Sequence, residues 1–151
     1  MKKTLLLLFF SLSYLSSAQE DFSDSWEDFF SYNNVKDFVK VENSIYALSD
    51  NAIFTYDFIT QEIQKLSSVQ GLSGETTTAI HYSIDTNRLI IGYENGLLEV
   101  VDSDGSITSS SDIVSFNQSG EKSINHIFEY QEKLYVSTSF AIVEYDINQL
   151  E

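Results

Sequence analysis

Short apolar runs separated by polar turn residues fill most of the chain, and three of these runs are alike. The three runs are Ile45 to Asp57, Leu89 to Asp102 and Leu134 to Asp146. Their first residues are 44 and 45 positions apart, and their closing aspartates are 45 and 44 apart. A repeat of about 40–45 residues that is rich in short strands is typical of β-propeller blades.

Each repeat is predicted to hold four short antiparallel strands. The first, apolar strand is expected at Asp37–Val41, Thr77–Tyr82 and Ser123–Phe128. The second and third strands are the two halves of each run, joined by turns at Asn51-Ala52, Asn95-Gly96 and Phe140-Ala141. Asn-Gly is the strongest of these turn signals, because both residues tolerate a positive φ. A more polar fourth strand is expected at Glu62–Leu66 and Ser106–Thr108.

The pattern therefore predicts an all-β, partial β-propeller over residues 36–151, with blades at about 36–67, 76–115 and 122–151. The last blade is expected to be incomplete, because the sequence stops shortly after Asp146. Closed propellers have at least about four blades, and an open stack exposes apolar faces. We expect the chain to be the N-terminal part of a longer protein or a truncated product. The alternative is a fragment that closes by self-association.

The N-terminus has the pattern of a secretory signal peptide over residues 1–18. Lys2 and Lys3 precede the apolar run Leu5–Phe10, and the small residues Ser16-Ser17-Ala18 precede the expected cleavage before Gln19. The apolar run is shorter than the roughly 20 residues that span a bilayer. The sequence thus predicts export without a membrane span, followed by an N-terminal leader segment over residues 19–35.

Composition narrows the possible functions. The chain has 151 residues, no cysteine, and eight Lys and Arg against 23 Asp and Glu, a net charge of −15. The absence of cysteine excludes disulfides and thiolate zinc sites. Binding of nucleic acid requires a basic face, which this composition does not supply. The lack of a Gly-x-Ser-x-Gly elbow or a Gly-rich phosphate loop further indicates a protein that is not an enzyme and holds no cofactor.

The two histidines are the strongest candidate for a site. His81 and His126 are 45 residues apart, and Asp37 occupies the matching place in the first repeat. One hypothesis is a ring of ligands beside the central channel that would bind a cation. The alternative is a repeat position that tolerates polar residues at a blade seam. No catalytic, cofactor-binding or metal residue is assigned. The run Asp102–Ser106 is read as a hairpin turn rather than a calcium loop, because the twelfth position is Ile113.

The residues of the second repeat resemble a known type of propeller. Gly71-Leu72-Ser73, Thr77–Ile80 and Arg88–Leu97 are similar to two-component-regulator propeller repeats, although the usual Trp of the second strand is missing and Tyr93 follows Gly92. The form Ile-Gly-Tyr-Glu-Asn-Gly and the opening segment Trp26–Asp37 resemble more closely the PorZ N-terminal propeller family of the type IX secretion system of Bacteroidota. The resemblance covers about residues 20 to 147.

This resemblance implies a role as a non-enzymatic, exported scaffold at the cell surface. Members of the PorZ family belong to an attachment complex with a sortase-like peptidase and outer-membrane partners, and they are implicated in lipopolysaccharide binding. They are longer, with two propellers and a C-terminal domain. The expected partners are proteins of that complex, and lipopolysaccharide through the full-length protein. Without the signal peptide, six basic residues oppose 23 acidic ones, and this net of −17 disfavours direct binding of an anionic glycan.

Two other functions stay open. The first is the periplasmic ligand-sensing propeller of a hybrid two-component receptor, which a downstream membrane helix and kinase would identify. The second is a fragment of a propeller glycosidase or lyase, which turnover of polysaccharide by the intact protein would identify.

Overall fold

The computed structural model describes residues 34–149. The expected signal peptide and most of the expected leader segment lie outside this range and stay predictions.

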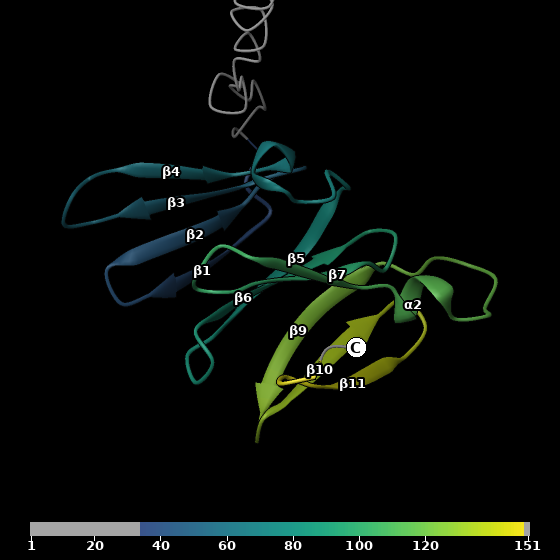
Figure 1. Cartoon of the computed structure of the whole chain (residues 1–151). Coiled ribbons are helices and arrows are strands. Elements are labelled where there is room, and N and C mark those ends of the chain that lie inside the picture. The colour runs from purple at the N-terminus through teal and green to yellow at the C-terminus, as the bar shows by residue number, and fades with distance from the viewer. Residues whose placement is uncertain (1–33, 150–151) are drawn as a thin grey trace, which may run out of the picture.

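The described residues form three antiparallel sheets (Figure 1). The first blade contains β1 (Asp37–Val41), β2 (Ser44–Leu48), β3 (Ile53–Asp57) and β4 (Ile63–Leu66). The second contains β5 (Thr77–Ser83), β6 (Arg88–Tyr93), β7 (Leu98–Val101) and β8 (Ile107–Ser110). The third contains β9 (Ile124–Tyr130), β10 (Lys133–Thr138) and β11 (Ile142–Asp146).

The strands of each sheet follow one another in chain order, as in a propeller blade. The first strands of the three blades are neighbours, since β1 lies against β5 and β5 lies against β9. We call these three strands the inner strands. The prediction of an all-β partial propeller is confirmed, with four, four and three strands in its sheets. Within the described residues no strand pairs with the free edge of β11, apart from a single bridge between Asp146 and Gln149.

Two short helices connect the blades, and neither was expected from the sequence. The 3-10 helix η3 (Ser68–Gln70) follows β4, and α2 (Asp112–Ser115) follows β8. Ser67 caps η3 through a reciprocal pair of hydrogen bonds with Gln70. Such helices are too short to show the 3.6-residue periodicity on which sequence reading depends.

The core lies between the sheets, so each sheet buries the face that meets its neighbour. We call the face of a blade toward the preceding blade its front face, and the other its back face. The core between the first and second blades contains Leu48, Ile53, Leu72, Ile80, Leu89, Ile91 and Tyr93. The core between the second and third blades contains Ala79, Ile90, Leu98, Val100, Ile113, Ile124, Ile127, Leu134, Val136, Tyr145 and Ile147. Apolar burial between successive blades is thus the main stabilising contribution.

Two glycines of the second blade are required by its packing. A Cβ at Gly92 would lie 2.5 Å from Cγ2 of Ile124 in the third blade, so this position lets two blades approach closely. Gly96 has a φ of +90° in the turn between β6 and β7. Such a φ favours glycine, and the predicted Asn95-Gly96 turn is confirmed.

The repeated aspartates close the third strand of each blade. Oδ1 of Asp57 accepts hydrogen bonds from the backbone N–H groups of Ile59 and Thr60, both at 2.8 Å. Oδ1 of Asp146 accepts one from the N–H of Asn148 at 2.9 Å. Asp102 instead forms an ion pair with Arg88 at 2.7 Å. At Asp57 and Asp146 the short carboxylate thus satisfies the backbone of the turn that follows the strand, whereas at Asp102 it holds the side chain of Arg88.

Candidate functional site at the seam between the second and third blades

The inner strands of the second and third blades are joined by a polar cluster. Nε2 of His81 on β5 lies 3.1 Å from Oε2 of Glu129 on β9. The hydroxyl of Ser83 donates a hydrogen bond to Oε1 of the same carboxylate, also at 3.1 Å. The side chains of His81 and Glu129 are 24% and 15% exposed. Both carboxylate oxygens of Glu129 are therefore occupied by the neighbouring blade, which fixes the position of this side chain.

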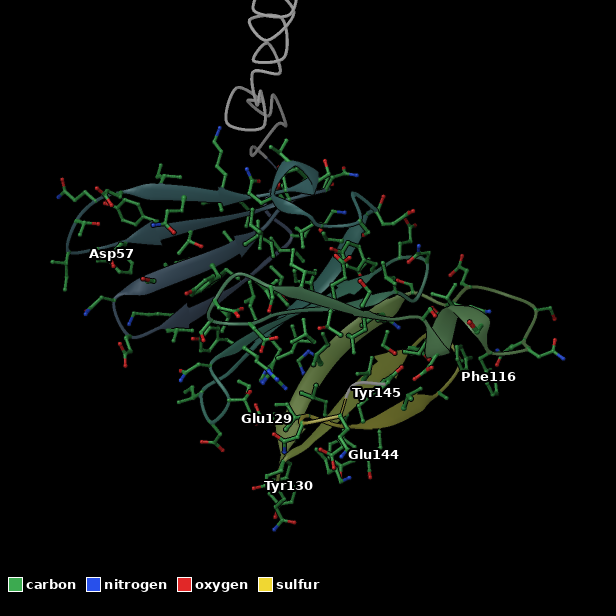
Figure 2. All side chains as sticks on the ribbon, in the orientation of Figure 1. Asp57, Phe116, Glu129, Tyr130, Glu144 and Tyr145 are labelled. Carbon is green, nitrogen blue, oxygen red and sulfur yellow. The ribbon has the colours of Figure 1, made fainter. Side chains whose placement is uncertain are left out.

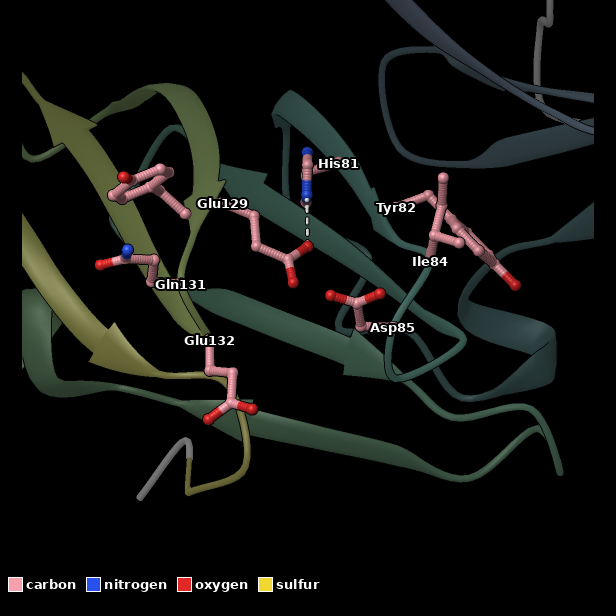
Figure 3. A pocket seen from close by; sticks show the side chains of 8 residues that line it. His81, Tyr82, Ile84, Asp85, Glu129, Gln131 and Glu132 are labelled. Carbon is pink, nitrogen blue, oxygen red and sulfur yellow. Dashed lines mark hydrogen bonds and ion pairs between the residues drawn. The ribbon is translucent and has the colours of Figure 1, made fainter.

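A pocket of about 490 Å³ lies beside this cluster (Figure 3). It is lined from the second blade by His81, Tyr82, Ile84 and Asp85, and from the third by Glu129, Tyr130, Gln131 and Glu132. The lining contains three carboxylates and neither lysine nor arginine. Its field is consequently negative, and it disfavours anionic ligands.

The predicted site residues are not brought together as a ring. Asp37 pairs with Leu48 on the second strand of the first blade, and His126 pairs with Ser137 on the second strand of the third blade. Leu48 and Ser137 occupy equivalent positions in their blades, so Asp37 and His126 are equivalent to each other. His81 pairs with Ile90, which is equivalent to Tyr46 and Tyr135. His81 therefore lies two residues away from the place that constant spacing in the sequence assigns to it.

The displacement has a simple cause in the turn lengths. The turn between β5 and β6 holds four residues, 84–87, whereas the equivalent turns of the other blades hold only Glu42-Asn43 and Gln131-Glu132. Two additional turn residues move the inner strand by two places relative to its partner. Asp37 and His126 are exposed, and Oδ1 of Asp37 accepts a hydrogen bond from the N–H of Phe38. A role for the three residues in binding at the channel stays a prediction.

The described part of the chain holds no group of three histidine, aspartate or glutamate side chains that could bind a metal ion. The run Asp102–Ser106 is a hairpin turn, as expected. The N–H of Asp102 donates to the carbonyl of Ser106, and Oδ1 of Asp104 accepts from the N–H of Ser106. Hydrogen bonds from the hydroxyl and, after it, the N–H of Ser106 lower the pKa of the Asp104 carboxyl.

A buried carboxylate, which sequence reasoning missed, lies at the seam between the first and second blades. Glu99 on β7 is 2% exposed. It accepts hydrogen bonds from the hydroxyl groups of Tyr93 and Ser109 and from the N–H of Ser73. Burial, and after it the hydrogen bond to this carboxylate, raise the pKa of the Tyr93 phenol well above its usual range. Glu99 therefore ties the Gly71-Leu72-Ser73 turn to the sheet.

The cationic side chains of the described region are engaged within the chain. Nζ of Lys36 contacts Asp50 and the carbonyl of Thr77, and Nζ of Lys122 donates to the carbonyls of Val114 and Phe116. The contact with Lys36 lowers the pKa of the Asp50 carboxyl. The charge that remains available to a ligand or partner is therefore predominantly negative.

Comparison with known proteins identifies the kind of propeller to which these blades belong. Residues 45–151 match the family described as the N-terminal β-propeller domain of PorZ of the type IX secretion system. The chain belongs to this family. The expected resemblance to PorZ is confirmed.

Two solved structures share this fold. PorZ of Porphyromonas gingivalis, described as an essential surface component of the type IX secretion system, superposes with a TM-score of 0.75 at 17% identity, over 83% of this chain. The extracellular domain of a putative hybrid two-component system from B. thetaiotaomicron superposes with a TM-score of 0.64 at 16% identity, over 80% of this chain. This chain spans only 17% and 16% of the length of those two chains. No curated protein sequence matches it.

In the part of the chain that the structure describes, no helix has the length and apolar character needed to cross a membrane.

Proposed function

We propose that this chain is the beginning of an exported, non-enzymatic scaffold protein of a type IX secretion complex, which acts through contacts with other proteins. The observation that carries this proposal is the match of residues 45–151 to the PorZ N-terminal propeller family. The whole-protein role is taken from the likeness to PorZ of Porphyromonas gingivalis, a surface component of that system.

The geometry of the chain supports a binding role. The polar cluster of His81, Ser83 and Glu129 joins two blades, and each oxygen of this carboxylate has a partner on the second blade. The pocket beside it is acidic, and the described cations are engaged elsewhere. This charge favours a protein partner with basic residues and disfavours direct contact with anionic lipopolysaccharide. In the proposed complex, lipopolysaccharide would be contacted by other parts of the full-length protein.

A second candidate is a sensory propeller of a two-component receptor. It is favoured by the fold shared with the extracellular domain from B. thetaiotaomicron. This candidate also places the chain outside the cytoplasm and without catalytic activity, so the two candidates differ in the phenotype expected when the protein is lost.

Deletion of the gene in its source bacterium separates the two candidates. The scaffold function predicts that cargo of the type IX system accumulates in the periplasm and is absent from the cell surface, with recovery when the intact gene is restored. The sensory function predicts normal cargo delivery and the loss of a transcriptional response to an external ligand. Normal cargo delivery in the deletion strain would contradict the scaffold proposal.

A further inference from the structure

The seam between the first and second blades contains a groove near the turns that follow β1, β3, β5 and β7. Two adjoining cavities of about 260 and 240 Å³ lie there, and both are lined by Tyr46, Thr55 and Gln64 of the first blade. Tyr82 and Asn87 belong to the opposite wall, on the second blade. We call the space between these five side chains the interblade groove. Both walls are blades that the structure describes, so blades added beyond the first or the third would leave this seam as it is.

The groove departs from the way in which the next seam is packed. The sheet ladders make Tyr46 equivalent to Ile90, and Thr55 equivalent to Val100. Ile90 and Val100 are 0% and 2% exposed in the core between the second and third blades. Tyr46 and Thr55 are only half-buried. The first blade thus carries polar residues where the second carries a packed apolar core, which reduces the stabilisation from burial. Such a departure from a local rule is expected at a functional site.

The groove offers hydrogen-bonding groups that the fold does not use. The hydroxyl of Thr55 and the side-chain amides of Gln64 and Asn87 form no hydrogen bond with another residue between 34 and 149. A hydroxyl can donate and accept, and a side-chain amide has two donor hydrogens and a carbonyl acceptor. An extended peptide presents N–H and C=O groups in alternation along its backbone. The unused groups of the groove are therefore complementary to a peptide backbone.

The outer end of the groove is acidic. Asp57 and Glu62 line the cavity there, and Figure 2 shows Asp57 at an end of the first blade that lies far from the third blade. The other charged side chains of the groove are engaged, since Asp102 pairs with Arg88 at 2.7 Å and Lys65 also has a partner. No lysine or arginine of the described region forms an ion pair with Asp57 or Glu62. This end therefore favours a basic residue of the bound segment.

We propose that the interblade groove binds a short extended segment of a partner protein, with a lysine or arginine of that segment at Asp57 and Glu62. The inference rests on the proposed function, in which the protein acts through contacts with other proteins. Tyr46 and Tyr82 stack on each other with their ring centres 5.5 Å apart, so one face of each ring is already covered. This arrangement leaves less aromatic surface for stacking against a sugar ring, which favours a peptide over a glycan.

Selection from a library of random octapeptides displayed on phage, with the intact exported protein immobilised, tests the groove. We expect the enriched octapeptides to contain lysine or arginine. Their affinity is then measured by fluorescence anisotropy with synthetic, labelled copies. Thr55→Val keeps the shape of the side chain and removes its hydroxyl, and it is expected to weaken binding by about 3- to 10-fold. Thr108→Val on β8 is the matched control, because Thr108 is exposed and lies outside both cavities.

A second pair of variants tests the acidic end. Glu62→Gln is expected to weaken binding of the basic octapeptides by about 3- to 10-fold at low salt and by less at high salt. Glu121→Gln removes an exposed carboxylate from the connection between the second and third blades and is expected to leave binding unchanged.

The stability of Thr55→Val separates a binding role of the hydroxyl from a structural one. Val100 occupies the equivalent place in the next seam, so we expect Thr55→Val to be at least as stable in urea as the wild type. A clear loss of stability would assign the hydroxyl to the fold and overturn its role in binding. Gln64→Ala, at an exposed position, tests the same cavity if Thr55→Val does not fold.

Other results would also overturn the proposal. The groove is not a peptide site if no octapeptide is enriched, or if Thr55→Val and Gln64→Ala bind the enriched octapeptides as tightly as the wild type. Binding of the neutral oligosaccharide maltohexaose that is lost in these variants, without binding of any octapeptide, would make the groove a glycan site. Cargo that accumulates in the deletion strain while no octapeptide binds would contradict the groove alone. Normal cargo delivery together with octapeptide binding would contradict the scaffold function alone.

Discussion

The phenol of Tyr93 donates a hydrogen bond to the carboxylate of Glu99, and both side chains are buried at the seam between the first two blades. The same carboxylate accepts from the N–H of Ser73 and the hydroxyl of Ser109. A buried carboxylate is stable in the folded state only when such donors replace its hydration. Its partners come from three separate segments, so Glu99 connects parts of the chain that are distant in sequence.

We therefore expect Glu99→Ala to lower the free energy of unfolding by about 2–4 kcal/mol, because it leaves the Tyr93 hydroxyl buried without its acceptor. Urea denaturation followed by fluorescence measures this change. Glu62→Ala removes an exposed carboxylate and is expected to change stability by less than about 0.5 kcal/mol. Equal effects of the two substitutions would show that the Glu99 carboxylate does not hold the seam together.

The raised pKa of Tyr93 predicts a loss of stability at alkaline pH. Its phenol stays protonated in the folded chain above the pH at which it ionises in the unfolded chain, about 10. The folded state then binds more protons than the unfolded state, so stability falls as the pH rises above about 10. Burial raises the pKa of Tyr46 and Tyr145 in the same direction.

Urea denaturation between pH 8 and pH 11 measures this dependence. The variant Tyr93→Phe retains the ring and removes the titrating group, so its stability should fall less steeply over this range. A slope identical to that of the wild type would contradict the assignment to Tyr93.

The turn formed by Asp57 predicts a loss of stability in acid. The N–H groups of Thr60 and Ile59 hold the pKa of this carboxyl below its usual range. The stabilisation by the ionised Asp57 carboxylate is fully present above the unfolded pKa of about 3.9. It disappears as the pH falls through the lower pKa of the folded state. In Asp57→Asn the side-chain oxygen still accepts both hydrogen bonds but carries no charge. We expect this variant to be less stable at pH 7, with a difference that shrinks below about pH 4.

Thermal unfolding from pH 7 to pH 2 follows this difference. Asp85→Asn, in the turn between β5 and β6, controls for the change in net charge. A deficit of Asp57→Asn that persists unchanged at pH 2 would mean that charge is not the cause.

The close approach of Gly92 and Ile124 predicts a strong effect of a single methyl group. A Cβ at position 92 would be 2.5 Å from Cγ2 of Ile124, so Gly92→Ala forces the two blades apart and is expected to cost about 1–3 kcal/mol. Ile124→Ala removes the side chain that the new Cβ would meet, and by itself it lowers stability because it leaves a cavity. The double variant should be less destabilised than the sum of the two single variants, by at least about 0.5 kcal/mol. Strict additivity in urea denaturation would contradict this contact.

The polar cluster between the inner strands predicts measurable coupling between His81 and Glu129. A double-mutant cycle with His81→Ala and Glu129→Ala at pH 7 is expected to give about 0.5–2 kcal/mol, because the pair is mostly shielded from solvent. The matched cycle uses Lys133 and Glu144, an exposed pair 3.9 Å apart, and is expected to give less than about 0.5 kcal/mol. If the coupling energy of Lys133 and Glu144 equals that of His81 and Glu129, the position of the second pair between the blades adds nothing to its strength.

The strands and turns could be predicted from the sequence because their signals are local. Short, nearly continuous apolar runs on either side of the turn formers Asn95-Gly96 predict β6 and β7 from the local sequence. Glu99 was missed for a physical reason. Between Leu98 and Val100 it has the pattern of a solvent-facing position, but both faces of a central blade are covered by neighbouring blades. Alternation then no longer separates buried from exposed residues.

The pairing of His81 with Glu129 was also beyond the sequence, because it depends on turn length. Equal spacing from His81 to His126 suggested equivalent positions, yet the longer turn after β5 moves His81 out of register with the other blades. Only the sheet ladder shows which residue of the next blade lies opposite. The repeat therefore indicated the fold without indicating its cross-blade contacts.

The two extra residues in that turn have a consequence for how such repeats diversify. Because side chains in a strand alternate between the two faces, a shift by an even number of residues leaves every apolar side chain on its original face. The apolar residues of the strand stay in the core, while its polar residues change their positions along the junction with the neighbouring blade. An insertion of two residues in such a turn can therefore change the polar contacts of one junction and keep the apolar face of the strand. A single-residue insertion would move the side chains of that strand to the opposite face.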